Sequence, residues 1–184
     1  MMLEEDLSKL KRVRYFSGQL LTAADLELEQ QYFREKLKRH NRHLHGSGVV
    51  FGLEVRIEDY KVRVSPGFAL DCTGEDIDVP EAVRIDPPQG QRFAFLMIAY
   101  RELETSSIPV PGESTQGEDR MQPTRIAEHY ELLFEPDDPY IGHVGDTALW
   151  MPCNRPHALP LAKLVYRWEN WEVDPWFEPP SITR

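Results

Sequence analysis

Three histidines near the end of a predicted helix are the first candidates for chemistry. His40, His43 and His45 lie within six residues, and clustered imidazoles can bind a transition metal. Only His40 and His43 share a helix face, and the adjacent carboxylate of an HExxH zinc site is absent. We therefore predict no bound metal and no cofactor. We expect His40 to face the protein core and the other two to cap carbonyl groups or face solvent.

The two cysteines and two further histidines form a second possible zinc set. Cys72, Cys153, His143 and His157 are suitable ligand types, but no CxxC pair supports such a site. Two cysteines are too few for a disulfide scaffold and fit a reducing compartment. A single bridge between Cys72 and Cys153 stays an open alternative.

Four acidic residues follow one another closely in a predicted hairpin. Carboxylates at Asp71, Glu75, Asp76 and Asp78 are oxygen ligands of the kind that a hard cation prefers. A charged, solvated hairpin edge that blocks pairing with other sheets explains the same residues with no ligand. We favour this second explanation.

The sequence contains no strong signature of an enzyme. No GxSxG motif, phosphate-binding loop or dinucleotide fingerprint is present. Ser47 lies between two glycines, but it follows a helix and precedes a strand, which is the reverse of a nucleophile elbow. We therefore predict a protein that is not an enzyme. A metal-dependent hydrolase built on His40, His43 and Asp71 is kept as an alternative.

Aromatic residues gather towards the C-terminus. Such side chains are enriched at protein interfaces, where they supply large contact areas. We predict an interface made by Trp150, Trp168, Trp171, Trp176 and Phe177. The alternative is a carbohydrate- or ligand-binding β module in which the tryptophans stack on a sugar.

One helix with clear ends precedes the rest of the chain. Thr22 is a good N-cap, Asp25 can complete a capping box, and Gly46 is a natural stop. These signals predict a helix over about residues 22–45. Its apolar face, which we expect to form a hydrophobic core with a sheet, consists of Leu26, Phe33, Leu37, His40 and Leu44. Packing of this face against another copy of the chain or against a different protein stays an open alternative.

After this helix the apolar spacing changes to that of strands. We expect short strands and a hairpin over residues 49–85, and a central strand buried on both faces at residues 92–102. A partner of this strand is expected at residues 124–134, and a last core strand at residues 159–168. Residues 105–124 and 135–156 are expected to form long irregular loops that make contacts between subunits.

The charge of the chain is unevenly distributed. The net charge is −10; residues 1–45 contain nine Lys/Arg and seven Asp/Glu, whereas residues 46–184 contain twelve and twenty-four. An acidic body is unsuited to phosphate backbones, so we predict no nucleic-acid partner. We also expect no signal peptide and no membrane span, because no apolar stretch is long enough.

Several segments together resemble a known family. They are YFSGQLLTAADLELEQQYFREKLKRHNRHLHGSGVVFGLEV, VRVSPGFALDCTGEDIDV, PTRIAEHYEL and LPLAKLV. The chain is similar, over about residues 13–168, to uncharacterised bacterial proteins associated with phage-tail-like, extracellular contractile injection systems. The segment VSPGFALDCTGEDIDV also resembles a β element of phage tail-fibre and baseplate proteins. The resemblance implies a structural role and carries no catalytic residues.

We predict an α+β fold in which a long N-terminal helix packs on an antiparallel β-sandwich or a partly open β-barrel with long Pro-rich loops. The expected parts are an arm and helix (1–46), a β domain (47–168) and an aromatic tail (169–184). The predicted function is a non-enzymatic structural or adaptor component of a phage-tail-like contractile particle, at the baseplate or a fibre attachment. Its partners are expected to be other subunits, with a homo-oligomer left open. We expect synthesis in the cytoplasm and a place in a released or cell-associated particle.

Overall fold

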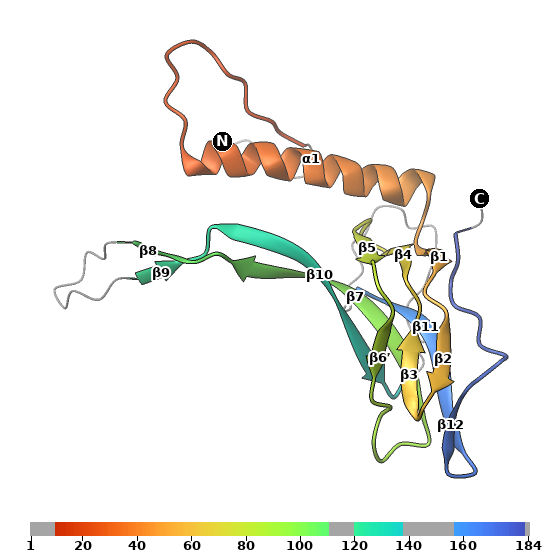
Figure 1. The fold of residues 1–184 in the computed structure, drawn as a ribbon. Helices are drawn as coiled ribbons and strands as arrows, with labels where there is room; N and C mark the ends of the chain where they lie inside the picture. Colours follow the sequence, from red (N-terminus) through yellow and green to blue (C-terminus); the bar gives the residue numbers. More distant parts are fainter. Residues whose placement is uncertain (1–9, 111–119, 138–156, 183–184) are drawn as a thin grey trace, which may run out of the picture.

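The protein is mostly β-structure in the parts that the structure describes. This computed structural model describes residues 10–110, 120–137 and 157–182 (Figure 1). They contain one helix, α1 (Ala23–Leu44), and twelve strands. The strands are β1 (Gly48–Gly52), β2 (Val55–Glu58), β3 (Lys61–Val64), β4 (Gly67–Leu70), β5 (Asp76–Val79), β6 (Val83–Ile85), β7 (Phe93–Thr105), β8 (Ile108–Val110), β9 (Arg120–Gln122), β10 (Arg125–Glu135), β11 (Ala158–Arg167) and β12 (Asn170–Val173).

The predicted α+β fold, with a long helix packed on a β-sandwich or partly open barrel, is wrong. The strands form a curled half-barrel, and the one helix lies outside it (Figure 1). The physical reason is that the sheets bury their apolar side chains against one another. The resulting core cluster contains no residue of α1.

Three sheets and one small ribbon make up the β-structure. Their strand orders are β10-β7-β11-β12, β1-β4-β5, β2-β3-β6 and β8-β9. The paired strands run antiparallel throughout these sheets. An isolated parallel bridge between Val49 and Ser181 also ties the C-terminal segment to β1.

The hydrophobic core lies where the three larger sheets meet. Six consecutive residues of β7, from Ala94 to Ala99, are buried, so this strand is covered on both faces as predicted. The predicted partner strand at residues 124–134 is confirmed as β10, which pairs with one edge of β7. The predicted core strand at residues 159–168 is confirmed as β11, and it pairs with the other edge of β7. Other fully buried side chains come from β3, β5 and β11: Val62, Val64, Ile77, Val79 and Leu164.

The two ends of β7 have different surroundings. Beyond Tyr100 the strand leaves the core, and its residues 101–104 are exposed. The pair β7 and β10 continues into the short ribbon β8 and β9, which forms an extended arm (Figure 1). The predicted irregular loop over residues 105–124 is therefore wrong where β8 and β9 form. The predicted loop over residues 135–156 lies mostly outside the described residues.

A glycine allows β1 to approach the turn before β4. Gly52 has φ +65°, and a Cβ atom there would lie 2.0 Å from the carbonyl oxygen of Pro66. The register of the two strands also shifts between Val49 and Phe51. Gly52 therefore marks the bulge and close backbone approach that its place in a strand predicts.

Helix α1 begins and ends where the sequence predicts. The Thr22 hydroxyl accepts a hydrogen bond from the Asp25 N–H at 3.2 Å, and the Thr22 N–H donates to the Asp25 carboxylate at 2.9 Å. The Thr22 hydroxyl also donates to the Asp25 carboxylate at 2.7 Å, and this bond together with that from the Thr22 N–H lowers the pKa of Asp25, because both favour the ionised carboxylate. Within the described residues, no helix has the length and apolar character needed to cross a membrane.

The apolar face of α1 is not part of the core, contrary to prediction. Leu26, Phe33, Leu37 and Leu44 are between 51% and 67% exposed, and His40 is exposed as well. The one buried residue of the described helix is Asn41. The helix is therefore attached to the β-structure by polar side chains.

We predict that Leu96→Ala lowers the free energy of unfolding by about 2–5 kcal/mol, because Leu96 is fully buried in β7 and its loss leaves a cavity. Leu103→Ala, in the exposed half of the same strand, is the matched control and should change it by less than about 0.5 kcal/mol. Denaturant unfolding measures both. Equal effects would contradict this location of the core.

Candidate interaction surface

The turn between β4 and β5, residues 71–75, is closed around one buried carboxylate. Asp71 is 3% exposed, and its Oδ1 accepts hydrogen bonds from the Thr73 N–H at 2.8 Å, the Thr73 hydroxyl at 2.6 Å and the Glu75 N–H at 2.9 Å. The backbone adds a bond from the Asp71 N–H to the Glu75 carbonyl at 2.9 Å. The turn is thus rigid, and its carbonyl groups at Thr73 and Gly74 point outward to other partners.

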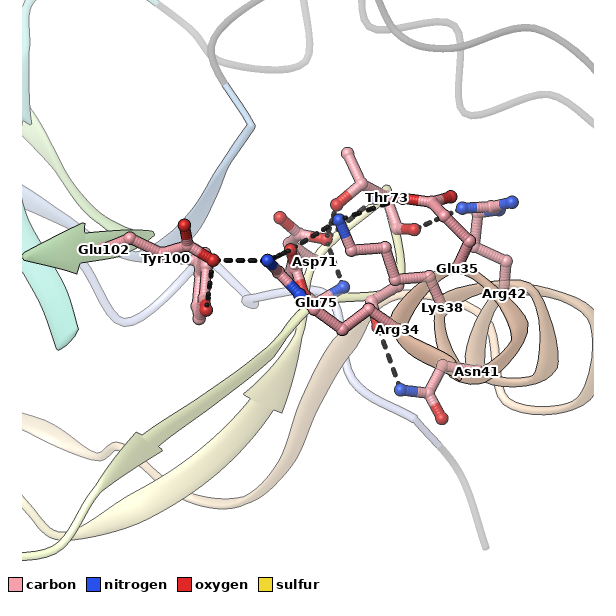
Figure 2. A network of polar contacts seen from close by, with 11 residues as sticks. Arg34, Glu35, Lys38, Asn41, Arg42, Asp71, Thr73, Glu75, Tyr100 and Glu102 are labelled. Carbon is pink, nitrogen blue, oxygen red and sulfur yellow. Dashed lines mark hydrogen bonds and ion pairs between the residues drawn. The ribbon is translucent and has the colours of Figure 1, made fainter. Parts of the chain in front are cut away.

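Those carbonyl groups hold the C-terminal half of the helix. The Asn41 side chain donates to the Gly74 carbonyl at 2.9 Å, and the Arg42 guanidinium donates to the Thr73 carbonyl. Figure 2 shows both residues reaching from the helix to the turn. We call this contact, formed by Arg34, Lys38, Asn41 and Arg42 with residues 71–75, the helix anchor.

Ion pairs complete the helix anchor. Lys38 Nζ lies 2.6 Å from a Glu75 carboxylate oxygen, and Arg34 lies 3.5 Å from the same oxygen. Arg34 also binds Glu102 on β7, which links the helix to the exposed half of that strand (Figure 2). The Lys38 and Glu75 side chains are only 19% and 15% exposed, so water screens this pair less than an open surface pair.

Gly74 is required for this close approach. Its φ is +89°, and an added Cβ would lie 2.2 Å from the carbonyl oxygen of Lys38. A side chain at this position would therefore push the helix away from the turn. Gly74 therefore permits both the backbone conformation of the hairpin turn and the close approach of the helix. The second role is not apparent from the hairpin sequence alone.

The apolar residues of α1 lie on a different face from the helix anchor. Arg34, Lys38 and Asn41 follow one another at helical spacing, about a quarter of a turn away from the row that contains Leu26 and Phe33. We call that second row the helix stripe. It consists of exposed residues only: Leu26, Gln30, Phe33, Leu37, His40 and Leu44.

Two aromatic residues stand at neighbouring hairpin turns with unusual backbone conformations. Tyr60 connects β2 to β3 with φ +62° and is 83% exposed, and Trp168 connects β11 to β12 with φ +51° and is 90% exposed. Strands β2 and β12 contact each other, and both turns lie at the lower end of Figure 1. Bulky residues rarely adopt positive φ, and such strain clusters at functional sites. We call Tyr60 and Trp168 the aromatic tip.

The other predicted interface aromatics differ in their surroundings. The rings of Trp171 and Tyr166 contact each other at a tilt, with centroids 5.4 Å apart, and the rings of Phe177 and Phe95 contact edge to face, with centroids 5.6 Å apart. Trp176 is 91% exposed. Trp150 lies outside the described residues. An interface made by the predicted set stays a prediction, and the exposed members Trp168 and Trp176 are the ones free to contact a partner.

The described residues contain no group of three or more His, Cys, Asp or Glu side chains that is suited to a metal ion. His40 and His45 have ring centroids 5.6 Å apart, and both are exposed, which corrects the expected core position of His40. Asp71 is used by its own turn. These residues, with His43, are therefore not assembled into the alternative hydrolase site.

The two remaining candidate sets are only partly assembled. Cys72 Sγ lies 3.1 Å from His157 Nδ1, while His143 and Cys153 lie outside the described residues. In the acidic hairpin, Glu75 pairs with the helix, whereas Asp76 and Asp78 line a cavity of about 660 Å³ beside β10.

Sequence reasoning missed several residues of these surfaces. Arg34, Asn41 and Glu102 are polar and gave no motif, although the spacing of Arg34, Lys38 and Asn41 marks a polar row on the helix. Tyr60 was missed because nothing in the sequence distinguishes this aromatic residue among the short strands expected over residues 49–85.

Comparisons with known proteins identify the fold. No family model matches the chain, and no curated protein matches it in sequence. A chain of the type VI secretion system TssK-TssF-TssG baseplate subcomplex matches 94% of this chain with a TM-score of 0.53 and 13% identity. TssK in its crystal structure matches 94% with a TM-score of 0.59 and 11% identity. A chain of the type VI baseplate complex also matches 94%, with a TM-score of 0.50 and 15% identity.

This chain spans only part of each of those proteins: 62%, 42% and 60% of their lengths in the same order. At such low identity the similarity establishes a shared fold. It agrees with the coarser part of the predicted resemblance, since the similar structures belong to a phage-tail-like secretion system. The extracellular contractile injection system in particular stays a proposal.

We predict that Gly74→Ala detaches the C-terminal half of α1, because the new methyl group would collide with the Lys38 carbonyl. Amides of residues 34–44 should exchange hydrogen at least about tenfold faster, while core amides are unchanged. Gly90→Ala is the control, since it has a similar φ of +70° with nothing within 4 Å. Equal exchange in both variants would contradict the helix anchor.

The pKa of Tyr100 tests its contact with Glu102, the carboxylate that also binds Arg34; the Tyr100 hydroxyl donates to it at 3.1 Å. Burial and then the neighbouring Glu102 carboxylate raise this pKa above its usual value. The unfolded chain ionises first as the pH rises, so the stability that the neutral phenol provides is present below about pH 10 and decreases above it. Glu102→Gln should lower the pKa only in part, because burial remains. Ultraviolet titration against Tyr100→Phe measures it, and an unchanged pKa would contradict the described pairing.

Proposed function

We propose that this chain is a structural subunit of a baseplate-type assembly in a phage-tail-like contractile particle, and that it works through protein–protein contacts. The observation that carries the proposal is the fold, which matches chains of type VI baseplate complexes over 94% of this chain. A particle of this kind contains many subunits, so its components need several contact surfaces.

The exposed apolar side chains support the proposal. Large exposed apolar areas on a soluble protein usually mark contact sites. The helix stripe and the aromatic tip are such areas, and they lie on separate elements of the molecule. We infer from them that the protein is an adaptor that contacts more than one neighbour, and that it has no enzymatic activity of its own.

The strained backbone at Trp168 supports a specific role for the aromatic tip. A left-handed conformation at a bulky residue costs about 1–3 kcal/mol, and glycine adopts it without that cost. A contact between the exposed ring and a partner would offset this cost and explain a tryptophan at this position. We propose that the aromatic tip docks on a neighbouring subunit of the particle.

Trp168→Gly tests this role directly. We expect the variant to be more stable than the wild type by about 1 kcal/mol, because it relieves the strain, and yet to be absent from assembled particles. Assembly is measured on contractile particles purified from the native host. Mass spectrometry quantifies the variant chain in them. A stabilised variant that still assembles would contradict the role of the aromatic tip.

Glu169→Gly is the matched control. Glu169 is the next residue of the same turn, with φ +64°, so its replacement relieves similar strain and keeps the tryptophan. It should gain stability and assemble normally. Point variants are preferable to deletion of the C-terminal segment, because β12 pairs with β11 and Ile182 bonds to Val49. Absence of the wild-type chain from every such particle would contradict the proposed function itself.

The tryptophans also keep a carbohydrate-binding module open as a second candidate, since Trp168 and Trp176 both present exposed rings. Glycan binding that is lost in Trp176→Ala and Trp168→Ala would favour this candidate over the adaptor.

A further inference from the structure

We propose that a cavity beside β10 binds an arginine side chain of another protein, whose guanidinium group contacts two tyrosine rings and the surrounding carboxylate groups. The cavity has a volume of about 660 Å³, and β5, β6, β7 and β10 contribute to its lining. We call it the acidic cavity, and its lining includes Asp76, Asp78, Glu81, Tyr100, Glu128 and Tyr130. The inference goes beyond the proposed function and does not depend on it, because it concerns a binding site apart from the helix stripe and the aromatic tip.

The charge of the acidic cavity is not balanced within the described residues. Its carboxylate groups belong to Asp76, Asp78, Glu81 and Glu128. None of these groups forms an ion pair with another described residue. Arg84 also lines the cavity, but its guanidinium lies 3.6 Å from a carboxylate oxygen of Glu58, a β2 residue outside the lining. The cavity therefore attracts a cation that the described part of the chain does not supply.

One pair of like charges shows where a cation is needed. In the ladder of β7 and β10, Glu128 lies directly opposite Glu102. Like charges in this position repel each other and destabilise the sheet. Arg34 binds Glu102 from the helix, whereas Glu128 has no cationic partner among the described residues (Figure 2). A cation beside Glu128 would remove the remaining repulsion, so this end of the cavity favours binding of a positive group.

Two tyrosines stand next to this pair of glutamates. Tyr130 lies directly opposite Tyr100, two residues along the same ladder. Side chains two residues apart in a strand share a face, so the tyrosines and the glutamates lie on one side of the sheet. Burial and then the carboxylates of Glu102 and Glu128 raise the pKa of Tyr100. Burial and then Glu81 raise the pKa of Tyr130, so carboxylates of the cavity act on both phenol groups.

An arginine side chain fits this combination of rings and carboxylates best. A guanidinium group is planar, stacks on aromatic rings, presents paired N–H donors to carboxylates and is less strongly hydrated than an ammonium group. The chain itself contains the same combination beside the cavity. There Arg34 binds Glu102, and the Tyr100 hydroxyl donates to Glu102 at 3.1 Å (Figure 2). A second guanidinium at Glu128 would repeat this arrangement across the ladder.

The acidic cavity is accessible to the surface of another protein. Asp78, Glu81 and Glu128 are exposed, so an arginine on a partner reaches them without a change in the fold. A volume of about 660 Å³ lies within the usual range for ligand sites and admits the arginine with part of its own chain. Arginine is also enriched at protein interfaces. A free polyamine, which has ammonium groups and no planar guanidinium, is the ligand that an experiment must distinguish from it.

Titration of the purified full chain with an acetylated Gly-Gly-Arg-Gly-Gly amide tests the site. NMR of ring-labelled tyrosines follows the signals of Tyr100 and Tyr130, which Tyr100→Phe and Tyr130→Phe assign. We expect saturable shifts of both signals with a Kd on the order of 1 mM, since one side chain makes only a few contacts. The same peptide with lysine should bind at least about threefold more weakly, and with uncharged citrulline at least about tenfold more weakly.

Three results of this titration would overturn the proposal. They are the absence of a shift at both tyrosine rings, equal binding of the arginine and lysine peptides, and tighter binding of spermidine than of the arginine peptide. The last result would assign the cavity to a free polyamine instead of a protein side chain.

Glu128→Lys tests the missing charge from within the chain. The new side chain would lie opposite Glu102, so the midpoint of thermal unfolding should rise and the affinity for the arginine peptide should fall at least about tenfold.

Glu131→Lys is the matched control on the same strand. Glu131 lies on the other face of the sheet and pairs with Arg101 at 2.6 Å, so its replacement should lower the midpoint and leave peptide binding unchanged. A midpoint that falls in Glu128→Lys, or an equal loss of binding in the two variants, would overturn the proposal. Because only purified protein and synthetic ligands are used, none of these outcomes bears on membership of a contractile particle.

Discussion

The Asp71 carboxylate is the constraint on which the position of the helix depends. It is buried and accepts three hydrogen bonds within residues 71–75, so the turn has one conformation. That conformation directs the carbonyl groups of Thr73 and Gly74 towards α1 and places Glu75 beside Lys38 (Figure 2). Without the hydrogen bonds to Asp71, the backbone of the turn could change conformation. Its carbonyl groups would then not be held in place to accept hydrogen bonds from α1. The orientation of α1 therefore follows from one buried carboxylate whose hydrogen bonds are satisfied.

The division between core and surface follows from the sheets. Strands β3, β5, β7 and β11 supply the largest of the fully buried side chains among the described residues, and the half-barrel closes its core without α1. This arrangement frees the apolar side of the helix for contacts with other molecules. It also explains why an amphipathic helix is held by its polar side, which would be unfavourable if the apolar side had no partner elsewhere.

The sequence predicted local structure better than it predicted packing. The N-cap at Thr22 and the buried run of β7 rest on local hydrogen bonding and on six adjacent apolar residues, and both signals appear in the sequence itself. The same apolar spacing on α1 led to the wrong conclusion, because spacing shows that a face will be covered and not which molecule covers it. Gly74 and Asn41 were missed for a related reason. Their roles depend on contact between segments more than thirty residues apart.

Strand β7 has a mechanical consequence. It runs without a break from the core into the arm, and it pairs with β10 through eleven consecutive residue pairs, from Arg125 opposite Thr105 to Glu135 opposite Phe95. A tensile force applied to the end of the arm acts along this strand, at right angles to its ladder bonds. Because β7 and β10 leave the body together, the bonds that resist this force are those between β7 and β11, which share the load in shear rather than opening one after another. The paired strands β7 and β10 therefore transmit a pulling force into the body of the protein without separating from it residue by residue.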